Sequence, residues 1–183
     1  KVVHVVRWGT NIVALVSSDR RGGVVPFPYL WDGTTWKAIH QGLADGMAAS
    51  LVVHEGQLLG SAKFSGLDGI QRPYLARWNG TEWGPVGEPM EGQGLTRFAS
   101  GPNGLHAFMD QIVLRFDGTR WEQLGGIFNE PIASILDSPS GLLVSGAFTF
   151  GGTDRGRVAR WDGTSWVPVG GGLGGIPPYV SYA

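Results

Sequence analysis

Three short segments combine acidic and basic side chains in a pattern that suits the binding of a polar ligand. They contain Asp19, Arg20 and Arg21; Asp68 and Arg72; and Asp154, Arg155 and Arg157. Mixed charges at this spacing are typical of a solvated surface on which local ion pairs hold loops in place. Binding residues also concentrate in loops that a rigid scaffold carries. We therefore predict the ligand-binding residues to be Arg20, Arg21, Asp68, Arg72, Asp154, Arg155 and Arg157.

Patterns for catalysis and metal binding are weak. The histidines, His4, His40, His54 and His106, have no metal-ligand spacing, and we interpret them as solvated or locally hydrogen-bonded side chains. No Gly-x-Ser-x-Gly sequence of a serine hydrolase is present. The sequence therefore predicts a protein that is not an enzyme and that uses no metal and no cofactor. The alternative of a hydrolase or lyase requires acids and histidines that converge at one channel mouth, for instance Asp68, Asp154 and His40.

Composition narrows the classes of partner. The 183 residues carry a formal net charge of -1 and no cysteine. Nucleic acid binding needs clustered lysine and arginine, so we expect no nucleic acid partner. No apolar run approaches the ~20 residues of a membrane-spanning helix. The absence of cysteine excludes disulfides and thiolate chemistry without deciding the compartment.

A hexapeptide that occurs four times organises the whole chain. The copies span residues 31–36, 78–83, 116–121 and 161–166 and read Trp-Asp-Gly-Thr-x-Trp with small variations. Successive copies therefore start 47, 38 and 45 residues apart. A period in this range is typical of solenoids, propellers and other repeat arrays.

The fourth repeat is the clearest and predicts four antiparallel strands. Apolar runs at 131–136 and 142–148 flank a turn cluster, and two more runs at 157–161 and 164–169 flank Asp162-Gly163. An Asp-Gly pair suits a two-residue type I′ turn, which would set Trp161 opposite Thr164. A four-residue loop would instead pair Trp161 with Trp166. In either register both tryptophans lie on the same face of the sheet and are expected to pack one blade on the next.

The first strand of each unit differs from the others. It contains small residues at 48–50, 99–100 and 133–134. Innermost strands crowd around a propeller axis, where small side chains fit. We therefore predict an all-β fold, a β-propeller segment of four four-stranded antiparallel blades, with approximate boundaries at 1–41, 42–88, 89–126 and 127–170.

These residues resemble a known group of repeats. The string Gly-Ala-Phe-Thr-Phe-Gly-Gly at 146–152, followed by Val-Ala-Arg-Trp-Asp-Gly-Thr-Ser-Trp at 158–166, is similar to the tandem Gly-rich, kelch-like β-propeller repeats of large exported bacterial proteins. The resemblance covers essentially the whole chain. It implies a binding or interaction scaffold in an extracellular, cell-surface or periplasmic location. Unit three departs from the pattern because it has no diglycine.

Two hypotheses about function and one about assembly complete the sequence-based expectations. The leading function is a non-catalytic scaffold for a protein or glycan ligand. The alternative is a glycan-binding lectin, which predicts that several of Trp31, Trp78, Phe116 and Trp161 are exposed in shallow pockets, and which would lose its support if all four were buried. Residues 171–183 are expected to begin a further blade or to form a closing strand. An open arc exposes sheet edges, so the segment would belong to a larger ring or associate with another propeller chain or a second copy.

Overall fold

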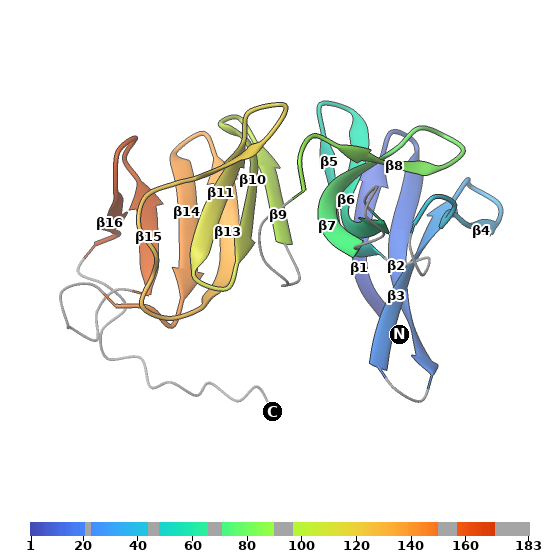
Figure 1. Ribbon diagram of the computed structural model, residues 1–183, viewed down its shortest axis with the longest axis horizontal. Coiled ribbons are helices and arrows are strands. Elements are labelled where there is room, and N and C mark those ends of the chain that lie inside the picture. Colours follow the sequence, from blue (N-terminus) through green and yellow to red (C-terminus); the bar gives the residue numbers. More distant parts are fainter. Residues whose placement is uncertain (21–22, 44–47, 66–70, 90–96, 150–156, 171–183) are drawn as a thin grey trace.

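The protein consists of four antiparallel β-sheets, each with four strands in sequential order. In the computed structural model, the described residues are 1–20, 23–43, 48–65, 71–89, 97–149 and 157–170, and they contain strands and no helix. Each sheet forms one blade, so the predicted four-bladed propeller segment is confirmed. Figure 1 shows the blades side by side, with most of their strands upright in the view and β8 lying across it.

Each blade is built from four consecutive strands of the chain. Blade 1 contains β1 (Val2–Trp8), β2 (Asn11–Arg20), β3 (Gly23–Trp31) and β4 (Trp36–Ala38). Blade 2 contains β5 (Ala48–His54), β6 (Gln57–Ser65), β7 (Gln71–Trp78) and β8 (Trp83–Val86). Blade 3 contains β9 (Arg97–Gly101), β10 (Gly104–Met109), β11 (Ile112–Phe116) and β12 (Trp121–Gln123). Blade 4 contains β13 (Ile132–Ser138), β14 (Gly141–Gly146), β15 (Val158–Trp161) and β16 (Trp166–Pro168).

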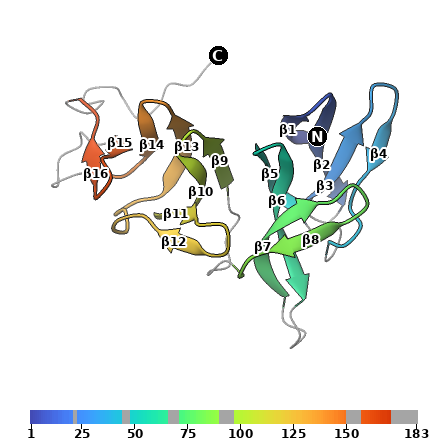
Figure 2. The ribbon, with the colours of Figure 1, turned by 90° about the horizontal axis from the view of Figure 1, so that it is seen from above.

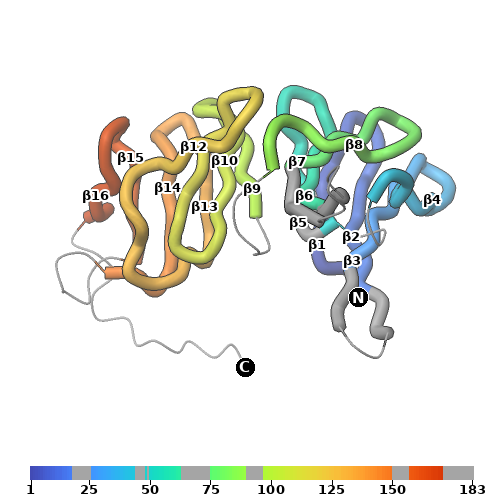
Figure 3. The backbone as a smooth tube through the Cα atoms, in the orientation of Figure 1, coloured from blue at the N-terminus to red at the C-terminus, as the bar shows by residue number. Residues whose placement is uncertain are grey.

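The blades fan out in an open arc (Figure 2), with blades 1 and 4 at its two ends. The first strand of each blade contacts the first strand of the next, from β1 through β5 and β9 to β13. Small residues predicted an inner position for three of these strands, β5, β9 and β13. The tube in Figure 3 shows the same path repeated four times along the chain.

The Asp-Gly turn adopts the second of the two predicted registers, the four-residue loop, and not the type I′ hairpin. In every blade the two aromatic residues of the motif pair directly, as Trp161 does with Trp166, so the loop has four residues. Only the glycine takes a positive φ, for example +108° at Gly163. Asp162 instead accepts hydrogen bonds from the backbone N–H groups of Thr164 and Ser165 at 2.9 and 2.8 Å. The aspartate is therefore selected as an acceptor that closes an Asx turn.

The motif aromatics of blades 2, 3 and 4 fill the spaces between blades, as predicted, whereas the two of blade 1 do not. Trp78 and Trp83 are buried in the core between blades 1 and 2, and Trp161 and Trp166 pack in the core between blades 3 and 4. The Trp83 indole donates to the Ile39 carbonyl of blade 1. Trp31 is half-buried and Trp36 is 50% exposed, because no described blade packs on this face of blade 1.

Candidate functional site

In the sequence, the predicted ligand-binding residues fall in or beside the segments that connect the second and third strands of blades 1, 2 and 4. The side chains of Arg20 and Arg72 and all of Arg21, Asp68, Asp154 and Arg155 lie outside the described part of the structure. Arg157 is described and half-buried, and its carbonyl accepts a hydrogen bond from the Gly146 N–H at 3.1 Å. The prediction for these seven residues therefore stays a prediction.

The structure instead brings polar side chains together at the opposite end of the blades, which we call the hairpin end. The turns between strands one and two and between strands three and four lie there (Figure 1). The leading sequence-based prediction placed no site at this end, and only the lectin alternative, through the motif aromatics, did so. Three of the four histidines make their contacts here or along the inner strands, and each of the three contacts the next blade.

These junction histidines correct the expectation of solvated or locally bonded rings. The His4 Nδ1 accepts the Leu51 N–H of blade 2 at 3.3 Å, and the His54 Nδ1 lies 2.9 Å from the Ser100 hydroxyl of blade 3. Both partners are more than 40 residues away in the sequence. Histidine spacing could not reveal these contacts, because each partner is set by the packing of one blade on the next.

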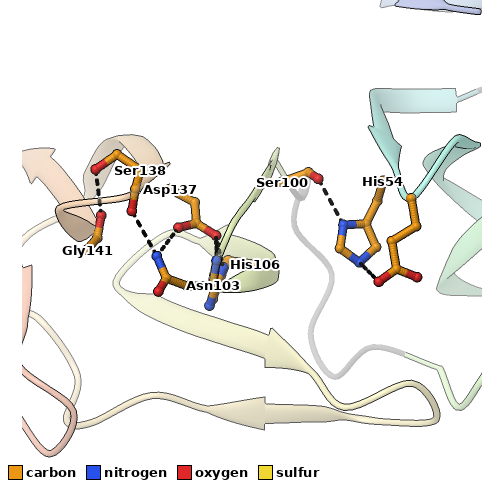
Figure 4. Close-up of polar contacts among 8 residues, drawn as sticks. His54, Ser100, Asn103, His106, Asp137, Ser138 and Gly141 are labelled. Atoms are coloured by element: carbon orange, nitrogen blue, oxygen red, sulfur yellow. Dashed lines mark hydrogen bonds and ion pairs between the residues drawn. The ribbon is translucent and has the colours of Figure 1, made fainter.

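The junction between blades 3 and 4 holds a deeply buried polar cluster (Figure 4). His106 of β10 lies with its Nδ1 3.4 Å from the Asp137 carboxylate of β13, and the two side chains are 3% and 0% exposed. The Asn103 backbone N–H donates to the same carboxylate at 3.1 Å, and the Asn103 side-chain amide donates to it and to the Ser138 carbonyl. The Asp137 carboxylate of blade 4 thus accepts hydrogen bonds from Asn103, in the β9–β10 turn of the preceding blade.

Burial favours the neutral form of two junction histidines, His4 and His106. It lowers the pKa of His106, and the nearby Asp137 carboxylate opposes this effect only in part. Burial and the Arg97 guanidinium also lower the pKa of His4. A lowered pKa keeps both rings neutral near pH 7. The neutral form of His4 can accept the Leu51 N–H, which a protonated ring could not do.

His54, Ser100 and Glu55 are of the residue types that form a nucleophilic catalytic triad. The Ser100 hydroxyl contacts the His54 Nδ1, while the His54 Nε2 lies 4.0 Å from the Glu55 carboxylate. That separation exceeds hydrogen-bond distance, and Glu55 is exposed on a type I′ turn with positive φ at Glu55 and Gly56. In a hydrolase triad the acid holds the ring through a hydrogen bond. The contact therefore acts here as a bridge between blades.

A cleft of about 610 Å³ lies between blades 2 and 3 at the hairpin end. Its polar walls include the junction pair His54 and Ser100, together with Arg77 of β7. Among the described residues, none forms a hydrogen bond or ion pair with the Arg77 guanidinium. The other residues that line the cleft are Glu55, Gln57, Leu59, Leu75, Val86, Gly101, Pro102, Gly104, Leu105, Phe116, Asp117 and Gly118. This volume lies in the range of small-ligand and peptide-side-chain pockets.

Of the four aromatic positions of the lectin alternative, one is buried and three are half-buried. Trp78 is 7% exposed and buried, and Trp31, Phe116 and Trp161 are half-buried. Of these four side chains, Phe116 lines the cleft between blades 2 and 3. Within the part of the chain that the structure describes, no group of three or more histidine, aspartate or glutamate side chains could hold a metal ion.

Comparison with models of known protein families and with curated proteins finds no match to this sequence. In the described ranges, no helix is long and apolar enough to cross a membrane. The kelch-like resemblance of the repeats therefore stays a hypothesis, and so does any function inferred from it.

Proposed function

We propose that this chain is a non-catalytic binding scaffold whose ligand is a segment of a partner protein. The observation that carries the proposal is the cleft between blades 2 and 3, with His54 and Arg77 on its walls and an apolar floor. The Arg77 guanidinium and the His54 ring beside apolar surface suit a peptide with an acidic side chain next to an apolar one. Glu55 and Asp117 also line the cleft and would bind a basic or hydrogen-bond-donating group of the same peptide. His54 and Arg77 both lie on strands of the blades, so binding orders side chains and not the backbone that carries them.

A glycan is the second candidate, and Phe116 is the observation that favours it. Its half-buried ring lines the cleft, where it could stack against a sugar, and the surrounding polar groups could bind hydroxyls. The exported, cell-surface or periplasmic location in a bacterium belongs to the same proposal, and it rests on the kelch-like resemblance.

Selection from a random peptide library displayed on phage tests the proposal. We expect selected peptides to carry aspartate or glutamate and to lose about tenfold or more in affinity for Arg77→Ala, measured by calorimetry. Arg115→Ala is the matched control, because Arg115 holds the same strand position in blade 3 and is exposed like Arg77. Equal losses for both variants, or no peptide that depends on Arg77, would reject the cleft. A glycan array probed with the same three proteins tests the second candidate.

A further inference from the structure

Exposed apolar side chains gather on the two end blades. The described residues leave eight large apolar side chains exposed: Val2, Val3, Val5, Ile12 and Trp36 in blade 1, Leu136 and Val169 in blade 4, and Ile127 in the connection between blades 3 and 4. A water-soluble surface rarely keeps such side chains together unless a partner covers them. We call the face of a blade toward the preceding blade its leading face and the opposite one its trailing face.

The leading face of blade 1 carries the apolar residues of an interior junction. Val5, Ile12 and Trp36 hold the same register positions as Leu51, Leu58 and Trp83 of blade 2. Their exposed fractions are 54%, 39% and 50% in blade 1, against 1%, 0% and 2% for the equivalents in blade 2. The two sets differ because blade 1 covers the residues of blade 2. Blade 1 is therefore built to receive a blade.

The trailing face of blade 4 shows the complementary pattern. Val169 is 41% exposed, whereas Ile39 and Leu124, which make the same backbone hydrogen bond in blades 1 and 3, are 4% and 8% exposed. Leu136 is 59% exposed, whereas the equivalent Val52 of blade 2 is 8% exposed. Each buried equivalent is covered by the blade that comes after it. Blade 4 thus presents the surface on which a further blade would pack.

A glycine after strand four shows how the two faces fit. Gly87 and Gly125 have positive φ values of +68° and +71° and lie against the aromatic hairpin of the next blade. A Cβ on Gly87 would meet the Thr119 carbonyl, and one on Gly125 would come within 2.9 Å of the Trp166 ring. Gly170 occupies the same place in blade 4 with φ +60°, and among the described residues nothing lies within 4 Å of its Cβ position. By analogy with Gly87 and Gly125, the neighbour that would fit against Gly170 is an aromatic hairpin such as residues 31–36 of blade 1.

We propose that the trailing face of blade 4 docks on the leading face of blade 1 of a second copy of this chain. The contacts are those of the three internal junctions, with Gly170 of one copy against the Trp31–Trp36 hairpin of the other. The junction is head-to-tail, and such contacts form a ring when the rotation closes. Two open arcs of four blades that share two such junctions make a ring of eight, within the usual range for propellers. A net charge of -1 per chain gives little repulsion between copies.

Sedimentation equilibrium of the 183-residue chain tests this assembly. We expect a dimer of the 19.5 kDa chain. Ile12→Glu on the leading face, or Leu136→Lys on the trailing face, should weaken dimerisation roughly tenfold or more, because each places a charge in an apolar junction. Ile127→Glu is the control, since Ile127 is exposed outside both faces, and its dimer should be unchanged. Circular dichroism of each variant establishes that the blades remain folded.

Mixing the variants tests the head-to-tail geometry. An equimolar mixture of Ile12→Glu and Leu136→Lys should form heterodimers, because one junction keeps two native faces and the other pairs the new charges. A face-to-face dimer would not be restored in this way. The chain has no cysteine, so Thr34→Cys/Gly170→Cys reports the contact as a disulfide between copies. A folded chain that stays monomeric at high micromolar concentration, or a dimer that neither charge affects, would overturn the proposal.

Discussion

The indole nitrogen of Trp166 donates a 2.8 Å hydrogen bond to the backbone carbonyl of Leu124. Trp166 belongs to blade 4, and Leu124 comes directly after the last strand of blade 3. Trp83 makes the same contact with Ile39 across the junction of blades 1 and 2. The second tryptophan of the motif therefore serves two purposes, since its ring fills the junction and its N–H satisfies a carbonyl of the preceding blade.

Replacing Trp166 with phenylalanine separates these two roles. Trp166→Phe keeps an aromatic ring but leaves the Leu124 carbonyl without its donor, so we expect a loss of about 1 kcal/mol in the free energy of unfolding. Trp121→Phe is the matched control, because the buried Trp121 N–H has no hydrogen-bond partner among the described residues. Urea titration measures both variants. If Trp121→Phe is the more destabilising of the two, the hydrogen bond to Leu124 contributes less than ring packing.

Substitution of Gly125 tests how closely blades 3 and 4 approach each other. Gly125→Ala places a Cβ within 2.9 Å of the Trp161 and Trp166 rings at a φ of +71°. Gly56→Ala imposes a similar backbone strain at φ +76°, but its Cβ meets nothing within 4 Å in the described structure. We expect Gly125→Ala to be more destabilising than Gly56→Ala by roughly 1–3 kcal/mol, because it adds overpacking to strain. Similar thermal midpoints for the two variants would contradict this expectation.

The turn aspartates should be replaceable by asparagine but not by alanine. Asn79 in blade 2 accepts the Thr81 and Glu82 N–H groups at 2.9 and 3.0 Å, as Asp162 does with its own neighbours in blade 4. Asp162→Asn should therefore change the thermal midpoint little, whereas Asp162→Ala removes the acceptor and should lower it. Differential scanning calorimetry compares the two. An equal decrease for both variants would show that negative charge, and not hydrogen bonding, stabilises the turn.

Acid should weaken the fold in two separate steps. Hydrogen bonds from Thr164 and Ser165 lower the pKa of Asp162 to about 2. A carboxyl with a lowered folded-state pKa stabilises the fold above its unfolded value of 3.8, and this contribution disappears as the pH falls towards about 2. The histidines act at higher pH, because burial lowers the pKa of His106 below its ordinary value of 6.5. Their contribution is complete above 6.5 and is lost as the pH falls from there to the folded-state pKa.

His106 gives the sharper test of this pH dependence. Asp137, Arg115 and His54 are the charged or titratable groups around its ring. We expect the wild-type free energy of unfolding to fall between about pH 7.5 and about pH 5.5, by at most ~1.4 kcal/mol per pH unit for each buried histidine. His106→Gln should show a smaller fall, whereas His40→Gln, at an exposed position, should match the wild type. A His106→Gln variant with the full wild-type pH dependence would assign the effect to other groups.

Sequence analysis predicted the blades well, because strands and turns are local. The alternation of apolar runs and turn clusters in the fourth repeat places β13 to β16 within a few residues of their observed bounds. Of the two turn registers that the sequence left open, the four-residue loop is the one observed. Asp-Gly is also the preferred pair of a type I′ turn, and composition could not show that Trp161 pairs with Trp166. That register is fixed by the packing of both rings in the same junction.

The sequence by itself determined that this protein is a row of four similar blades, since the Trp-Asp-Gly-Thr-x-Trp repeat encodes each strand pair locally. Only the tertiary structure decided what the polar residues do. His54 meets Ser100 and His106 meets Asp137 because neighbouring blades set those positions face to face, across 46 residues in the first pair. The same holds for the tryptophans of the motif. Trp83 is buried and Trp36 is exposed because a described blade packs on one of them and not on the other.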